Sequence, residues 1–147
     1  MKASVQSPLR MNPDEIVSVL FEGGWPEVPN RPEQRRALSR NDRRKARCFR
    51  HSISGRYLYV KVKPGDHSAP RPWPIVIRSE DSDLARSIAD QDIVFADFTH
   101  GSMYGRFATR RHRGNEEEHY GMQLATESIS ALRRFLSAYA VAVEGKQ

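Results

Sequence analysis

The spacing of apolar residues changes from a helical period to a period of 2 at about residue 56. In the segment 56–63, Leu58, Val60 and Val62 alternate with aromatic and basic residues, namely Tyr57, Tyr59, Lys61 and Lys63. Successive side chains of a strand point to opposite faces, so this alternation predicts a β-strand with one apolar face. Further strands are expected over 73–78, 92–98, 104–111 and 118–125. These segments together predict an antiparallel sheet.

Helical patterns lie near the two ends of the chain and in one central segment. Asn12, Pro13 and the two acidic residues after them are typical of the start of a helix. The glycine pair at 23–24 is typical of the end of that helix. A short acidic helix is expected within 79–92. The segment 126–143 carries an apolar stripe at three- and four-residue spacing, formed by Ile129, Leu132, Leu136, Tyr139 and Val143. This stripe predicts a helix that closes one face of the sheet.

The chain has 147 residues, a length typical of one domain. Residues 1–11 have no periodicity and are expected to be disordered. Residues 12–147 are expected to form a single α+β domain, in which a curved antiparallel sheet of about five strands is packed by the C-terminal helix. N-terminal helices complete this fold, and residues 31–50 are expected to form an arginine-rich helical segment within it.

The helix expected over 32–47 has few apolar positions, among them Ala37, Leu38 and Ala46. So polar a helix buries little surface and is not held strongly by an apolar face of its own. Two interpretations remain open. The segment is either a solvated surface helix or an arginine-rich segment that an anion orders.

Positive charge is concentrated in less than a quarter of the chain. Twelve cations and two acids lie between Arg31 and Lys63, a local net charge of +10, whereas the rest of the chain has a net charge of −4. Such a patch attracts polyanions, and the arginine fork suits phosphate groups. We therefore expect phosphate contacts from a group of arginines in this region: Arg35, Arg36, Arg40, Arg43, Arg44 and Arg47.

The strand over 56–63 adds aromatic rings to this charge. Tyr57 and Tyr59 are expected to share a face with Lys61 and Lys63, so that rings could stack on bases while ammonium groups follow the phosphates. The alternative is structural, with the tyrosines covered by a helix and the lysines at the rim of the sheet.

Residues 105–121 are expected to form a hairpin with its turn at Gly114-Asn115. Arg106, Arg110 and Arg111 would extend the basic track along its first strand. Acidic residues at 117 and 118 are expected opposite the arginines at 110 and 111. In the alternative, a helix would run from residue 115 to 143, at a cost of about 1 kcal/mol for the glycine at 121.

Five residues are candidates for catalysis if their strands are neighbours: Asp97, His100, His112, Glu116 and His119. A metal-dependent nuclease or ribonuclease would need such a grouping of carboxylates and histidines. The chain has no HxH, HExxH, CxxC, phosphate-loop or GxSxG motif. We therefore expect no catalytic residue, no metal site and no cofactor, and the nuclease remains an alternative.

A cytoplasmic protein without membrane contact is expected, because Cys48 is the only cysteine and no apolar run is long enough for a signal peptide or a membrane span. The function favoured by the sequence is non-catalytic binding of nucleic acid, DNA or RNA. The alternative is a small inhibitor or adaptor that docks its basic face on an acidic protein. The oligomeric state is left open.

Overall fold

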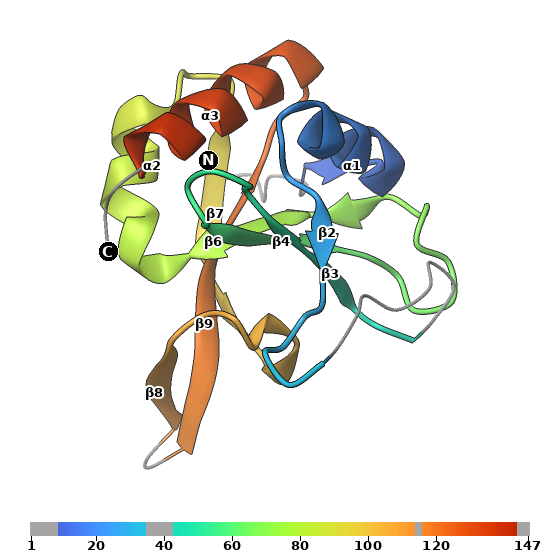
Figure 1. The fold of residues 1–147 in the computed structure, drawn as a ribbon, viewed down its shortest axis with the longest axis vertical. Coiled ribbons are helices and arrows are strands. Elements are labelled where there is room, and N and C mark those ends of the chain that lie inside the picture. Colours follow the sequence, from blue (N-terminus) through green and yellow to red (C-terminus); the bar gives the residue numbers. More distant parts are fainter. Residues whose placement is uncertain (1–8, 35–42, 114–115, 144–147) are drawn as a thin grey trace, which may run out of the picture.

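The computed structural model describes residues 9–34, 43–113 and 116–143 (Figure 1). The strands are β1 (Arg10–Met11), β2 (Glu27–Val28), β3 (Ala46–Arg50), β4 (Tyr57–Lys61), β5 (Arg71–Pro72), β6 (Ile75–Arg78), β7 (Val94–His100), β8 (Thr109–Arg113) and β9 (Glu116–Ala125). The helices are α1 (Pro13–Glu22), α2 (Ser82–Ile88) and α3 (Ile129–Ala142), with short 3-10 turns η1 (Ser79–Asp81) and η2 (Ser102–Tyr104). The chain is therefore mixed α and β, as expected.

Seven strands form one antiparallel sheet in the order β2-β3-β4-β6-β9-β7, with β8 paired to the far part of β9. A separate two-stranded sheet joins β1 to β5. Each of the five predicted strand segments overlaps an observed strand, and β2 and β3 extend the main sheet beyond the expected five. Among the described strands, the edges β2 and β7 do not pair with each other, so the sheet is open.

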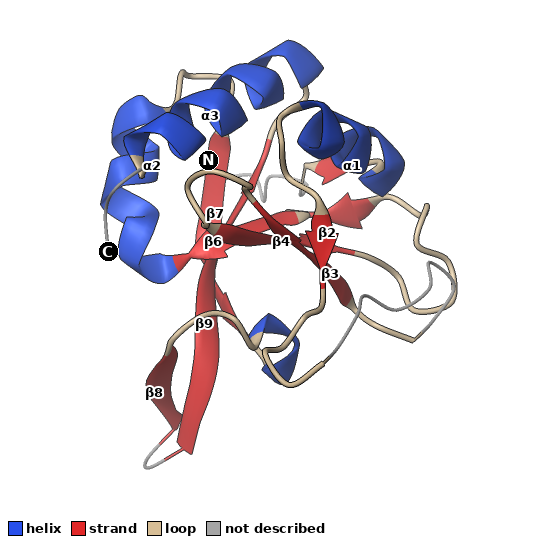
Figure 2. Ribbon diagram, viewed as in Figure 1, coloured by secondary structure: helices blue, strands red, loops and turns tan. Residues whose placement is uncertain are grey.

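The three α-helices cover one face of the sheet (Figure 2). Asn12 caps α1 by accepting a hydrogen bond from the Asp14 amide at 2.8 Å, and Ser128 caps α3 by accepting one from the Ala131 amide at 3.0 Å. The apolar stripe predicted for α3 faces the core, where most of its side chains are buried. Among the described residues, no helix is long and apolar enough to cross a membrane.

A second apolar cluster lies on the opposite face of the sheet and consists of Ala46, Cys48, Tyr59, Val76, Tyr104 and Phe107. The turn η2 and the residues after it supply its cover. The alternation in β4 is confirmed, because Leu58 and Val60 join the helical core while Tyr59 joins the second cluster. Burial raises the pKa of the Cys48 thiol to about 12, so this thiol stays protonated at neutral pH.

The helix expected to reach residue 47 is wrong at its C-terminal end, where Ala46–Arg50 form strand β3. Ala46 and Cys48 face the second cluster, while Arg47 and Phe49 face the other way. This alternation has a period of 2, but a buried arginine occupies one of its positions. Residues 35–42 of the expected helix lie outside the described residues.

Two other boundaries differ from the expectation. Arg10 and Met11 form β1, with Met11 buried, so the segment 1–11 is ordered at its end; residues 1–8 are not described. The strand expected from 104 begins only at Thr109, because Tyr104 and Phe107 instead turn inward and pack on Tyr59. The long helix considered from residue 115 is wrong, since β9 occupies Glu116–Ala125.

Candidate functional site

A cleft of about 250 Å³ lies between the connection from β2 to β3 and the turn η2. Its described lining residues include three cations and no acid: Asn30, Arg31, Gln34, Arg44, Lys45, Ser102 and Met103. We call it the basic cleft. It combines residues that are far apart in the sequence, and of these only Arg44 was predicted as a phosphate contact.

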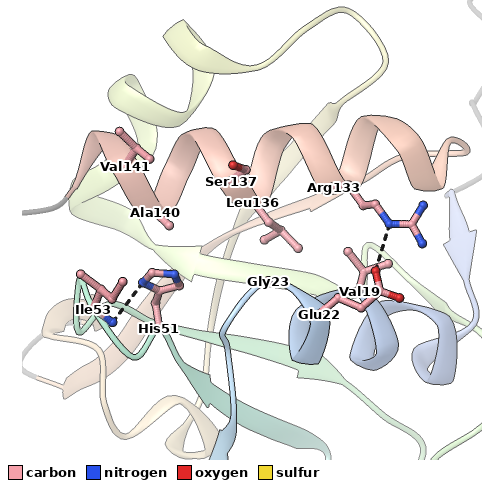
Figure 3. A pocket seen from close by; sticks show the side chains of 10 residues that line it. All are labelled: Val19, Glu22, Gly23, His51, Ile53, Arg133, Leu136, Ser137, Ala140 and Val141. Atoms are coloured by element: carbon pink, nitrogen blue, oxygen red, sulfur yellow. Dashed lines mark hydrogen bonds and ion pairs between the residues drawn. The ribbon is translucent and has the colours of Figure 1, made fainter.

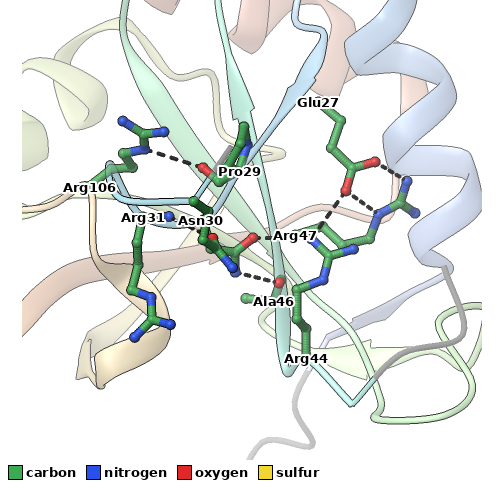
Figure 4. Close-up of polar contacts among 9 residues, drawn as sticks. Glu27, Pro29, Asn30, Arg31, Arg44, Ala46, Arg47 and Arg106 are labelled. Carbon is green, nitrogen blue, oxygen red and sulfur yellow. Dashed lines mark hydrogen bonds and ion pairs between the residues drawn. The ribbon is translucent and has the colours of Figure 1, made fainter. Parts of the chain in front are cut away.

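Asn30 holds the wall of the basic cleft in place (Figure 4). Its side-chain nitrogen donates to the Ala46 carbonyl oxygen at 2.8 Å, and its side-chain oxygen accepts from Arg44 at 3.1 Å. Its backbone oxygen accepts from the Tyr59 hydroxyl at 2.6 Å. One buried asparagine therefore ties the β2–β3 connection to β3 and β4. An isolated Asn in a proline-rich connection carries no sequence signal for this role.

Arg44 and Arg47 both pair with the single carboxylate of Glu27 on β2 (Figure 4). Arg47 makes a two-pronged contact, with Nη2 to Oε1 at 2.6 Å and Nε to Oε2 at 3.1 Å. Arg44 approaches the same carboxylate at 3.4 Å. Both guanidinium groups are nearly buried, so they hold β2 against β3, and Arg47 has no exposed surface for a phosphate contact.

Tyr59 has no exposed surface and packs edge-on against Tyr104 and Phe107. Its hydroxyl also accepts a hydrogen bond from the Arg106 amide at 2.9 Å. Burial raises the pKa of this phenol above its usual range. The stacking role predicted for Tyr59 is therefore wrong, because the second apolar cluster covers both sides of its ring. The alternative expectation, that other residues cover the tyrosines of this face, is correct for Tyr59, although a turn and not a helix covers it.

Tyr57 is half-buried and lies between two arginines at the start of β4. The guanidinium carbon of Arg106 is 4.9 Å from the ring centroid, and that of Arg50 is 5.8 Å from it. Arg106 also donates from Nε to the Pro29 carbonyl oxygen at 3.2 Å. The close approach of Arg50 to the next turn requires Gly55, where an added Cβ would lie 3.1 Å from the guanidinium.

Arg31 reaches the same region by packing on a glycine. A Cβ added at Gly105 would lie only 2.4 Å from Arg31 Cγ, so this contact depends on the absence of a side chain. Arg31 is exposed and approaches Glu33 at 3.4 Å. Arg43 and Lys45 are also exposed. We call these cations and the Tyr57 group together the basic interface, which consists of Arg31, Arg43, Lys45, Arg50, Tyr57 and Arg106.

The remaining predicted cations have different surroundings. Arg35, Arg36 and Arg40 lie outside the described residues. Lys63 is exposed, whereas Lys61 is half-buried and donates a hydrogen bond to the side-chain oxygen of Gln123.

The hairpin of β8 and β9 extends away from the body of the protein (Figure 1). Arg110 lies opposite Glu118 and Arg111 lies opposite Glu117, which is the expected cross-strand arrangement. Both arginines are exposed. Acids beside them reduce the net charge of this arm, so its attraction for a polyanion is weaker than that of the basic interface.

The candidate catalytic residues have separate contacts. The strands β7 and β8 each pair with β9 and not with each other. His100 stacks on Tyr120, and its Nδ1 is 3.9 Å from a Glu118 oxygen. His119 Nδ1 is 2.6 Å from the Phe107 carbonyl oxygen, while Asp97 is exposed. Within the described part of the chain, no three acidic, histidine or cysteine side chains are grouped for a metal ion. The side chains of His112 and Glu116 are not described.

A hollow of about 420 Å³ lies on the helical side of the sheet, between α3 and the ends of α1 and β3 (Figure 3). Ile53 and Val141 line it and are highly exposed, while Glu22 and Arg133 form an exposed ion pair at 3.2 Å beside them. This hollow is mainly apolar and lies across the sheet from the basic interface. The cations of α3 are therefore suitable positions for control substitutions.

No family model, curated protein or solved structure matches this chain.

Proposed function

We propose that the protein binds nucleic acid without cleaving it and holds the phosphate backbone on the basic interface. The observation that carries this proposal is the basic cleft, where Arg31, Arg44 and Lys45 meet and no described lining residue is acidic. Glu27 neutralises Arg44 only in part, since the same carboxylate also pairs with Arg47. The excess positive charge favours an anionic ligand with repeated charges.

The described residues on both sides of segment 35–42 support the same proposal. Gln34 and Arg44, the described residues near the two ends of this segment, both line the basic cleft. Arg35, Arg36 and Arg40 within the segment are proposed as further phosphate contacts, as are Arg110 and Arg111 on the hairpin. Backbone contacts of this kind position a protein without reading sequence, so we propose weak or no sequence specificity.

The direct test is a salt titration of binding to labelled single- and double-stranded DNA and RNA oligonucleotides, with the same samples run on a denaturing gel. If about six phosphates are contacted, the affinity is expected to fall by roughly 10³ between about 50 and 200 mM salt, because counterions are released on binding. The strands are expected to remain intact with added magnesium, manganese or zinc. Affinity that does not depend on salt would contradict the proposal. No binding at the lowest salt would favour an acidic protein partner, and cleavage would favour the nuclease.

Replacing Tyr57 by alanine is expected to weaken binding to single strands by about fivefold, or roughly 1 kcal/mol, which is the low end of the range for one stacked base. The low end applies because two arginines already cover part of the ring. Tyr57→Phe keeps the ring and loses only the hydroxyl, so it separates stacking from a hydroxyl contact. An equal loss in both variants, measured by fluorescence anisotropy on a poly-pyrimidine strand, would show that the ring does not stack.

A further inference from the structure

Two half-buried cations, Lys61 and Arg71, lie where the end of β4 meets the segment of β5 and β6. The Lys61 amide donates to the Pro74 carbonyl oxygen at 2.7 Å, which joins β4 to this segment. Arg71 lies in β5 and is held in register opposite Met11 of β1. Both backbones are thus fixed by hydrogen bonds, and the two side chains are not on mobile loops.

No carboxylate of the described residues pairs with either cation. The Lys61 ammonium donates to Gln123 Oε1, and the Gln123 amide nitrogen donates to the Asp97 carbonyl oxygen at 2.8 Å. This second bond holds the amide with its oxygen toward the lysine. Arg71 Nε is buried and has no hydrogen-bond partner in the described structure. A buried charged donor without an acceptor is costly to the fold.

Arg71 is close enough to Lys61 for its positive charge to act on the Lys61 ammonium. Burial and the charge of Arg71 lower the pKa of Lys61 to about 8. The charge of Arg71 also acts on Tyr104, whose pKa burial raises to about 12. The charge of Arg71 therefore acts on ionisable groups of both β4 and η2. Other ionisable groups on the surrounding elements are Lys45 before β3, which is cationic, and the exposed Asp97 on β7.

We propose that Lys61 and Arg71 together bind an oxyanion, namely a phosphate or sulfate group. Such an anion accepts hydrogen bonds from both the ammonium and the guanidinium, and its charge offsets their mutual repulsion. The phosphate has two possible sources, a free small anion or a nucleic-acid backbone. The second source rests on the proposed function. It is supported by the link between β4 and the basic cleft, where the Val62 amide donates to the carbonyl oxygen of the lining residue Lys45.

The test is a titration with sulfate at constant ionic strength, followed by amide chemical shifts. Sulfate is the probe because it does not titrate near neutral pH. Saturable shifts are expected for residues around Lys61 and Arg71, with an affinity that falls as the pH rises through about 8 and Lys61 loses its proton. Lys61→Met and Arg71→Gln are each expected to weaken sulfate binding at least tenfold. Arg134→Gln, an equal loss of charge on the exposed face of α3, is the matched control.

Shifts that do not saturate, or affinities that are the same in Lys61→Met, Arg71→Gln and Arg134→Gln, would overturn the site. A second measurement on the unaltered protein covers the case in which a variant does not fold. The pKa of Lys61, followed by the side-chain carbon shifts, is expected to rise when sulfate is added, and an unchanged pKa would also overturn the site.

Oligonucleotide binding by the same variants distinguishes the two sources. Loss of sulfate and oligonucleotide binding together, with sulfate competing against the oligonucleotide, supports the site and assigns its ligand to the backbone. Loss of sulfate binding alone supports a site for a free anion, whether or not the protein binds nucleic acid.

Discussion

Glu27→Gln is expected to lower the free energy of unfolding by about 3 kcal/mol, the low end of the cost of removing one partner of a buried ion pair. The Glu27 carboxylate accepts two hydrogen bonds from Arg47 and one from Arg44. These guanidinium groups are only 5% and 9% exposed. Glutamine keeps the size of the side chain but removes its charge, and its amide nitrogen would face another donor. Two guanidinium groups would then remain buried beside each other without a counter-charge.

Urea unfolding measures this loss of stability. The midpoint is expected to shift to a lower urea concentration, while the dependence of the free energy of unfolding on urea stays constant. Glu22→Gln is the matched control, because Glu22 pairs with Arg133 at 3.2 Å in an ion pair whose two side chains are more than half exposed. Exposed pairs contribute little, so the control is expected to change stability by no more than about 0.5 kcal/mol. Equal losses of stability in the two variants would mean that burial does not strengthen the ion pairs of Glu27 with Arg44 and Arg47.

The parts of the fold that the sequence predicted depend on local patterns. The start of α1 follows from an asparagine cap and a proline at the first helical position, and α3 follows from a stripe with helical spacing. The alternation in β4 likewise assigns each side chain to a face. In these segments the residues that decide the conformation are neighbours in the chain, so they can be interpreted without knowledge of the tertiary contacts.

The parts that the sequence did not predict depend on distant partners. The start of β3 was assigned to the arginine-rich helix, because an arginine at 47 conceals the alternation of the strand. Only Glu27, twenty residues earlier, makes a buried arginine favourable there. Tyr59 was expected on an exposed face because nothing near it in the chain indicates that η2 would fold over it. In both cases a long-range contact decides whether a side chain is exposed.

The candidate site was predictable in its charge but not in its residues. The concentration of cations between Arg31 and Lys63 indicates a basic surface, and the basic cleft lies within it. Which cations are available depends on the acids that the fold brings to them. Glu27 forms an ion pair with Arg47, whereas Lys61 and Arg71 have no carboxylate partner among the described residues. Single sequences do not show such pairings, because the partners lie on different strands.

The double charge reversal Arg31→Glu with Lys45→Glu is expected to weaken oligonucleotide binding by at least about 100-fold at low salt. Both side chains are exposed and line the basic cleft, so the change removes two phosphate contacts and adds two charges that repel the backbone. The slope of the logarithm of affinity against the logarithm of salt concentration measures the number of phosphate contacts. Each lost contact is expected to lower this slope by about 1, so the double variant should lower it by about 2. Neither residue pairs with Glu27, so the free energy of unfolding is expected to change little.

The matched control reverses Arg133 and Arg134, two exposed cations on α3, across the sheet from the basic interface. It changes the net charge by the same amount, so it accounts for the general effect of lower charge on a polyanion. If binding depends only on the net charge of the protein, the two double variants will show equal losses of affinity and equal reductions in the salt dependence of binding. A loss confined to Arg31 and Lys45 would instead locate the phosphate contacts at the basic cleft, because only position distinguishes the two variants.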